Sequence, residues 1–205
     1  WRHSSSSPTL HPFDHMTNAP ERTAASEDLP RAFRAHVLRE RLFPKHSTVL
    51  VGVSGHSDSV TLLRLLANLA LEIRVRLVAG HVHGETPEAK ADATFVHHLA
   101  TTLTLPFETG TMASSSSTGS ADADHWLAPL TEIAQRTGAQ VIATAETQDD
   151  AAERLLIVLL GDEPFLTGVL ASVTDGHVRP LLPFSHEACV TYLTRRGFLF
   201  RLNPD

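Results

Sequence analysis

The fold is decided by residues Ser47–Ser59, which read STVLVGVSGHSDS. The first seven of them are rich in β-branched side chains and carry no charge, a pattern typical of a strand buried on both faces of a parallel sheet. The last six form a turn of small residues. The apolar side chains that follow, from Val60 to Leu71, recur at the spacing of a helix with a broad apolar face. The stretch therefore predicts a strand, a tight turn and a helix in direct succession.

The same alternation of strands and helices continues along the chain in both directions. A helix over 29–43, which Pro44 stops, precedes the first strand. Further strands are predicted at 73–81, 104–108, 140–144 and 178–182, and further helices at 87–103, 126–137, 149–160 and 185–196. Strands that alternate with helices of this length imply right-handed crossovers. We therefore predict an α/β fold with a doubly wound, mostly parallel five-stranded sheet and helices on both faces.

A single domain is predicted over residues 29–205. The length of 205 residues suits one domain with a substantial core. Residues 1–28 are rich in Ser, Pro, His and Thr without apolar periodicity, which is typical of a flexible tail. Met16 leaves open that the first fifteen residues come from a cloning vector or lie upstream of the natural start. Residues 111–123 are mostly Ser, Gly and Ala, and we expect a mobile loop there.

Composition excludes several classes of function. The net charge is −6, and Lys45 and Lys90 are the only lysines, which argues against holding nucleic acid by charge alone. A local patch of scattered arginines stays open. No apolar run approaches the ~20 residues that a membrane span needs, and no signal segment opens the chain, so a cytoplasmic protein is expected. The sequence sets no oligomeric state.

Cys189 is the only cysteine of the chain. A single cysteine cannot form a disulfide within one chain, a cysteine zinc site or a cysteine-ligated iron–sulfur cluster. Its neighbours Ala188 and Val190 favour a small buried core residue over a nucleophile.

The turn at 54–59 is the first candidate site, because it joins a buried strand directly to a helix. Free backbone N–H groups and the positive end of the helix dipole attract phosphate there. Serine hydroxyls add donors, and Asp58 can hold a magnesium ion that itself binds phosphate. The alternative is that Ser57 or Asp58 merely caps the helix. The predicted phosphate contacts are Ser54, Gly55, His56, Ser57, Asp58 and Ser59.

Two more clusters follow strands that end at the same rim, where ligands of doubly wound sheets bind. His81 and His83 follow the second strand beside a glutamate, and nucleotide or substrate contact is favoured over a zinc site there. Asp149, Asp150 and Glu153 open a helix after the fourth strand. Asp149 and Glu153 are four residues apart and share one helix face, which suits magnesium or a substrate amine. The alternative is a charged first turn that complements the helix dipole.

Three motifs resemble one enzyme family. The loop SGHSDS looks like the Ser-Gly-Gly-x-Asp-Ser signature of the PP-loop ATPases. The segment ATAETQDDAAER (143–154) resembles Ala-Thr-Gly-His-His-x-Asp-Asp-x-Ala-Glu-Thr of the tRNA(Ile)-lysidine synthetases, and Arg179-Pro180-Leu181-Leu182 resembles their Arg-Pro-Leu-Leu. His81 stands where that family has a His-x-x-His element. The resemblance spans roughly residues 49–205, in family order.

The resemblance implies an adenine nucleotide alpha hydrolase-like fold and an AMP-forming ligase that uses ATP and Mg²⁺. In that family, ATP adenylates the C2 carbonyl of a wobble cytidine in tRNA(Ile), and lysine then displaces AMP. The residues at 54–59 and His81 would contact the nucleotide, with Asp58 and Asp149 holding magnesium. Arg179 would neutralise a phosphate or the adenylate, or alternatively anchor a strand end. The implied catalytic set is Asp58, Asp149, Glu153 and Arg179.

Four departures from the family pattern leave a second hypothesis open. His56 replaces the second glycine of the loop, where a side chain would crowd pyrophosphate or strain the backbone. Glu146-Thr147 replaces the His-His pair, and 121–125 is acidic where arginines are expected. The chain also ends at Asp205, where the family continues into tRNA-binding regions. The alternative is a degenerate, non-catalytic nucleotide-binding or interaction protein. A related tRNA-thiolating enzyme is disfavoured because only one cysteine is present.

Overall fold

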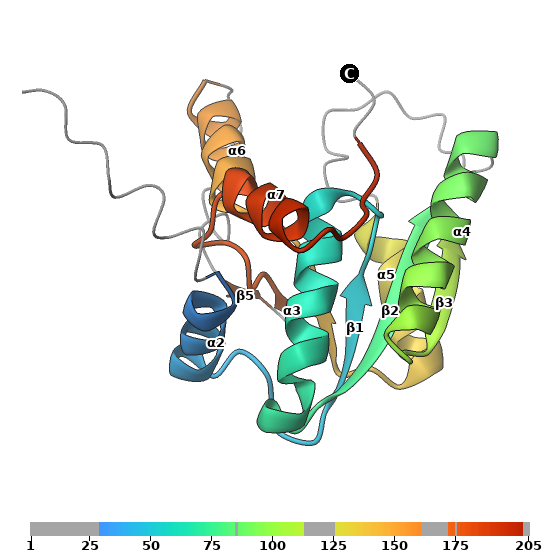
Figure 1. Ribbon diagram of the computed structural model, residues 1–205, viewed down its shortest axis with the longest axis horizontal. Helices are drawn as coiled ribbons and strands as arrows, with labels where there is room; N and C mark the ends of the chain where they lie inside the picture. Colours follow the sequence, from blue (N-terminus) through green and yellow to red (C-terminus); the bar gives the residue numbers. More distant parts are fainter. Residues whose placement is uncertain (1–28, 85, 113–125, 161–171, 175, 203–205) are drawn as a thin grey trace, which may run out of the picture.

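The structure is a computed structural model that describes residues 29–84, 86–112, 126–160, 172–174 and 176–202. The predicted tail over 1–28, most of the predicted loop over 111–123 and the acidic stretch at 121–125 lie outside the described residues. Figure 1 shows a central sheet with helices packed against both of its faces.

The described residues form a six-stranded sheet in the order β3-β2-β1-β4-β6-β5. All neighbouring strands run parallel except β5, which pairs antiparallel with β6. This confirms the doubly wound, mostly parallel sheet. The sheet has one strand more than predicted. Strands β5 and β6 form a hairpin and are only two residues long, which is too short to leave a periodic pattern in the sequence. The strands are β1 (Thr48–Gly52), β2 (Arg76–His83), β3 (Phe107–Thr111), β4 (Val141–Ala143), β5 (Val173–Thr174) and β6 (His177–Val178).

The last predicted strand, over 178–182, is wrong beyond its first residue. The chain leaves β6 after Val178 and turns through residues 180–183. Proline explains the early end, since Pro180 and Pro183 have no N–H group to donate to a neighbouring strand.

Helices cover both faces of the sheet, as predicted. One hydrophobic cluster joins α2, α3, α4 and α7 to the side chains of Val49 and Val51 on β1. A second cluster joins α5 to Leu50 and Val78, whose side chains point to the opposite face. The helices are α2 (Leu29–Glu40), α3 (Ser57–Ile73), α4 (Pro87–Thr102), α5 (Leu127–Thr137), α6 (Gln148–Leu160) and α7 (His186–Arg195). No helix among the described residues is long and apolar enough to cross a membrane.

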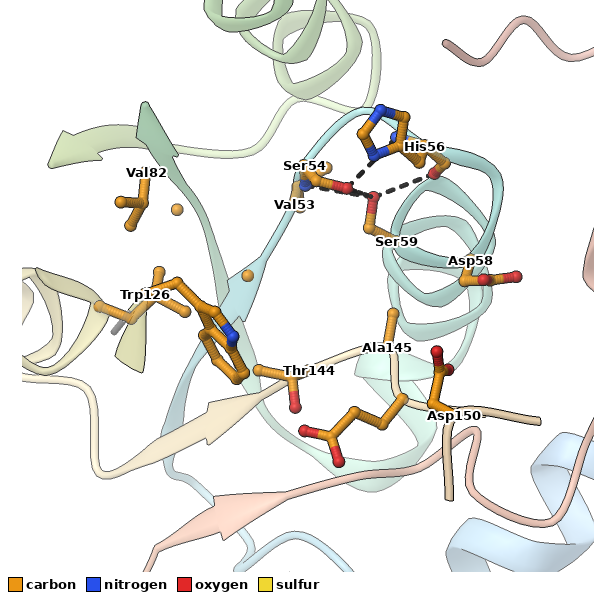
Figure 2. A pocket seen from close by; sticks show the side chains of 14 residues that line it. Val53, Ser54, His56, Asp58, Ser59, Val82, Trp126, Thr144, Ala145 and Asp150 are labelled. Atoms are coloured by element: carbon orange, nitrogen blue, oxygen red, sulfur yellow. Dashed lines mark hydrogen bonds between the residues drawn. The ribbon is translucent and has the colours of Figure 1, made fainter. Parts of the chain in front are cut away.

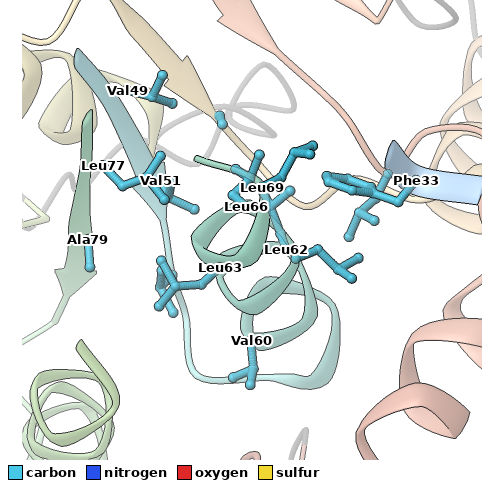
Figure 3. Packing of buried hydrophobic residues seen from close by; sticks show 14 of the residues in the cluster. Phe33, Val49, Val51, Val60, Leu62, Leu63, Leu66, Leu69, Leu77 and Ala79 are labelled. Carbon is cyan, nitrogen blue, oxygen red and sulfur yellow. The ribbon is translucent and has the colours of Figure 1, made fainter. Parts of the chain in front are cut away.

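Helix α3 contributes many buried residues to the larger hydrophobic cluster. Figure 3 shows Leu62, Leu63 and Leu66 of this helix packed between β1 and Phe33 of α2, and all three leucines are fully buried. Full burial of such a side chain stabilises a protein by roughly 1.5–3 kcal/mol. The helix that follows the turn at 54–59 is therefore firmly anchored, and so is the turn itself.

Several element boundaries differ from the prediction because non-glycine residues adopt left-handed backbone conformations. Arg41 and Arg74 have φ values of 51° and 58° and follow the last residues of α2 and α3. Thr104, at φ 56°, likewise delays β3 until Phe107. Glycine signals such a helix end in a sequence, and Gly138, with a φ of 66°, ends α5 in this way. Arginine and threonine give no such signal.

The strand order places a topological switch point between β1 and β4. From β1 the chain proceeds to β2 and β3 on one side, and β4 then joins the other side of β1. The connections on the two sides therefore diverge at the carboxyl ends of β1 and β4. Such a divergence opens a crevice in doubly wound sheets.

Candidate functional site

A cavity of about 330 Å³ lies at this switch point. Its walls come from the turn after β1, the end of β2, the start of α5 and the segment after β4, and Figure 2 shows their side chains converging. The lining residues are Gly52, Val53, Ser54, His56, Asp58, Ser59, Gly80, Val82, Trp126, Leu130, Thr144, Ala145, Glu146 and Asp150. The predicted meeting of the segments after β1 and β4 is confirmed.

The turn between β1 and α3 is tied together by the hydroxyl of Ser59. This oxygen accepts hydrogen bonds from the backbone N–H groups of Ser54 and Gly55, both at 3.2 Å, and it donates to the carbonyl of His56 at 3.0 Å. The hydroxyls of Ser54 and Ser59 lie 3.0 Å apart. The Ser54 hydroxyl also accepts from the N–H of His56 at 3.3 Å. Serine hydroxyls thus occupy three of the N–H groups that the sequence offers to phosphate.

Gly55 is required by the shape of this turn. Its φ of +100° is a conformation that other residues rarely adopt, and a Cβ atom there would lie 3.3 Å from both Phe95 and Arg201. The backbone of Arg201 also donates a hydrogen bond to the Gly55 carbonyl at 2.8 Å. The outer side of the turn is therefore closed by packing.

His56 does not strain the backbone, so of the two effects expected of a side chain at this position only the crowding of pyrophosphate stays a prediction. Its φ of −76° and ψ of 166° are extended values open to any residue, and it occupies the N-cap position of α3. The capping alternative is also wrong, because Ser57 and Asp58 lie inside the first helical turn. Gly55 and Ser57 are buried beneath the surface of the cavity, whereas Ser54, His56, Asp58 and Ser59 line it.

The carboxylate of Asp58 is directed toward α7 rather than into the cavity. Figure 2 shows it at the edge of the cavity, pointing away from Trp126 and Thr144. The Nδ1–H group of His186 donates to Asp58 Oδ2 at 2.8 Å. Burial raises the pKa of Asp58, and the hydrogen bond from His186 opposes that rise. The same hydrogen bond raises the pKa of His186.

Asp149 reaches the same histidine from α6. Its Oδ2 atom accepts a hydrogen bond of 2.7 Å from the backbone N–H of His186. The structure therefore brings Asp58 and Asp149 together through His186 of α7, which sequence reasoning missed because nothing marked this residue within the predicted helix at 185–196. Glu153 is exposed, and neither it nor Asp149 lines the cavity.

Asp150 is the one carboxylate of that cluster that lines the cavity. Its Oδ2 atom accepts hydrogen bonds from the backbone and the hydroxyl of Thr147, both at 2.7 Å. The Thr147 hydroxyl in turn accepts from the N–H of Asp150 at 3.4 Å. This reciprocal pair stabilises the start of α6, so Asp150 fits the alternative of a structural first turn.

Arg179 lies behind the cavity wall. It is 5% exposed, its NH1 donates to Glu146 Oε2 at 3.3 Å, and its NH2 donates to the hydroxyl of Thr174 at 3.2 Å. Its backbone N–H also donates to Ser172. The side chain therefore anchors the β5–β6 hairpin, in line with the alternative stated for it. Glu146, which stands between Arg179 and the cavity, was recognised in the sequence only as a departure from the family pattern.

His81 points to the opposite side of β2 from the cavity. It is 3% exposed, its Nδ1 atom lies 2.7 Å from the Val53 carbonyl, and its ring stacks on His83. Burial lowers the pKa of His81. The histidine therefore contacts the backbone of Val53 at the start of the turn and does not line the cavity. The residues of β2 that line the cavity are Gly80 and Val82.

Cys189 is fully buried, as expected, and burial raises the pKa of its thiol. A thiol held in its neutral form is a poor nucleophile. The residue therefore serves the packing of α7 next to Asp58.

The carboxylates of Asp58 and Asp149 fit a magnesium ion that is also bound by the phosphates of a ligand. Magnesium is usually held by one or two carboxylates together with substrate phosphates and water. Asp58 and Asp149 meet at His186 and could supply such carboxylates. Within the described ranges, no group of three or more His, Cys, Asp or Glu side chains could hold a metal ion by itself.

The sequence is similar to a known protein family and to individual proteins. A model of the PP-loop domain matches residues 27–204. The chain is 37% identical over 186 residues to a tRNA(Ile)-lysidine synthase from Thermus thermophilus and 32% identical over 183 residues to one from Symbiobacterium thermophilum. These matches cover 86% and 83% of this chain but only 35% and 38% of the two relatives. The chain thus spans little more than a third of their length.

Solved structures of similar shape support the fold. The U34-tRNA thiolase NcsA from Methanococcus maripaludis superposes with a TM-score of 0.70 at 15% identity, covering 88% of this chain and 67% of the thiolase. A glutamine-dependent NAD⁺ synthetase from Acinetobacter baumannii, in complex with ADP, superposes with a TM-score of 0.55 at 16% identity, covering 94% and 35%. At such identities the likeness concerns the fold alone.

Proposed function

This chain belongs to the PP-loop domain family, and from that premise we propose that it is the ATP-binding domain of a ligase of the tRNA(Ile)-lysidine synthase type. The observation that carries the proposal is the cavity at the switch point, with the Ser54–Ser59 turn at one end. The curated relatives, of which it spans about a third, supply the choice of reaction.

The cavity offers separate surroundings for the two ends of a nucleotide. Ser54 and Ser59 present hydroxyls beside the first turn of α3, where phosphate oxygens are favoured. Val82, Leu130 and Trp126 give an apolar wall that suits a base. In this arrangement the phosphates take over the contacts that the serine hydroxyls now make with the backbone N–H groups of the turn.

The proposed reaction has two steps. The C2 carbonyl oxygen of a wobble cytidine attacks the α-phosphorus of ATP, so that an O–P bond forms and pyrophosphate leaves. The amine of lysine then attacks C2, the C2–O bond breaks, AMP leaves with both electrons, and the amine loses a proton. Bound magnesium would offset the charge of the phosphates.

The residues of this chain are assigned to these steps by position. Asp58 and Asp149 would hold the magnesium ion after exchanging their hydrogen bonds to His186 for it. Asp149 and Glu153, on the first turns of α6, would receive the amine of lysine. Arg179 would offset charge on the adenylate from behind Glu146.

The proposal is tested in two stages. Titration calorimetry of the protein with ATP and magnesium measures binding. Turnover is measured as lysine-dependent release of pyrophosphate in the presence of tRNA(Ile) that bears a CAU anticodon. Saturable release that requires both lysine and tRNA is expected. Absence of ATP binding at millimolar concentration would remove both the ligase and any nucleotide-dependent role.

A second candidate is a nucleotide-binding protein without catalysis. It is favoured by the hydrogen bonds that already hold Asp58 and Asp149 on His186. Binding of ATP without pyrophosphate release under any condition supports this candidate against the ligase.

A further inference from the structure

The wall of the cavity carries an unusual balance of charge for a site that receives a polyanion. Among the described residues that line it, Asp58, Glu146 and Asp150 carry carboxylates, and none is lysine or arginine. Each negative charge near bound phosphate opposes binding by Coulomb repulsion. Asp58 is hydrogen-bonded to His186 and Asp150 to the start of α6. Glu146 is therefore the carboxylate whose partners are guanidinium groups.

Glu146 stands between the cavity and those guanidinium groups. Its side chain is 14% exposed and lines the cavity, whereas that of Arg179 is 6% exposed and does not. The Oε2 atom of Glu146 lies 3.3 Å from NH1 of Arg179 and 3.9 Å from NH2 of Arg154. One carboxylate thus lies between the cavity and two guanidinium groups.

We propose that Glu146 is an internal counter-anion that weakens the binding of nucleotide phosphates by occupying the guanidinium group of Arg179. This inference rests on the proposed nucleotide binding and adds to it a residue that sets affinity. A phosphate group of the ligand and the Glu146 carboxylate compete for the same positive charge. Removing the negative charge at position 146 therefore strengthens phosphate binding instead of impairing it.

The Glu146→Gln variant separates charge from structure. Glutamine has nearly the same shape, and its amide oxygen can still accept the hydrogen bond from Arg179. One negative charge disappears from the cavity wall. One partly screened charge changes the affinity for a charged ligand by about threefold to tenfold. The matched control is Glu108→Gln, because Glu108 pairs with Arg136 at 3.6 Å on β3 and lies outside the cavity lining.

The experiment is a calorimetric titration of the wild type and both variants with adenosine, AMP and ATP. We expect Glu146→Gln to bind AMP and ATP about threefold to tenfold more tightly, with unchanged affinity for adenosine and a gain that shrinks as salt is added. Glu108→Gln should match the wild type for all three ligands. A gain in affinity cannot result from partial unfolding, so the expected sign is informative.

Two outcomes overturn the inference. Equal shifts for adenosine and AMP would show a change of packing rather than of charge, and unchanged or weaker AMP binding would show that Glu146 does not compete with phosphate. If neither the wild type nor Glu146→Gln binds any of the three ligands, both this inference and the proposed function fail. Wild-type binding with no effect at position 146 refutes the inference alone.

Discussion

Replacing Gly55 by alanine should destabilise the protein far more than the same change at another left-handed glycine. The φ of Gly55 is +100°, and a Cβ atom there would lie 3.3 Å from side-chain atoms of both Arg201 and Phe95. Gly138 is the matched control, since its φ is +66° and nothing lies within 4 Å of an added Cβ. The two positions share backbone handedness and differ in crowding.

The magnitudes follow from separating these two costs. A left-handed backbone costs a residue with a Cβ roughly 1–2 kcal/mol, which is the whole effect expected at Gly138. At Gly55 the tight contacts add about 1–3 kcal/mol, as for other insertions of a methyl group into a packed region. We therefore expect Gly55→Ala to lower the free energy of unfolding by about 2–5 kcal/mol.

Urea unfolding followed by circular dichroism measures both variants. A double variant, Gly55→Ala with Arg201→Ala, should recover part of the loss, because the shortened side chain no longer meets the new methyl group. The reasoning is refuted if Gly55→Ala costs no more than Gly138→Ala, since the turn would then have room that the structure does not show.

Three further predictions concern the surroundings of the turn. Ser59→Ala should cost about 1–3 kcal/mol of unfolding free energy, because it removes the acceptor of two backbone N–H groups. A loss below about 0.5 kcal/mol in a urea titration would contradict this. His186→Ala should cost about 0.5–1.5 kcal/mol, reduced by the exposure of the imidazole, while His186→Asn should retain most of that stability because its amide can replace Nδ1. Equal losses in the two variants would show that the hydrogen bond to Asp58 contributes nothing. Since burial lowers the pKa of His81 below 6.5, its contribution to stability is present above that pH and lost as the pH falls through the lowered value. As the pH falls below 6.5, His81→Asn should therefore lose less unfolding free energy in urea titrations than the wild type, and identical losses would refute the assignment.

The sequence by itself determined the elements that depend on local pattern. The apolar run of β1, the small-residue turn and the leucine-rich helix α3 are each visible within a few residues, because burial on both faces and helical periodicity repeat at short range. The alternation of strands and helices then set the parallel sheet, and the parallel sheet set the rim where the segments after β1 and β4 meet. Interruptions without a local signal, such as the left-handed Arg74 and the two-residue hairpin strands, were missed.

Only the tertiary structure decided which partner each charged side chain of the site has. His186 and Asp58 are 128 positions apart in the chain, and Arg179 and Glu146 are 33 apart. No periodicity links such positions, because the pairing depends on how α7 and the β5–β6 hairpin pack beside the cavity. The sequence allowed the loop and most of the ionisable residues of the site to be predicted. The directions of their side chains arise from packing between distant segments, which turns Asp58 toward His186 and places Glu146 in front of Arg179.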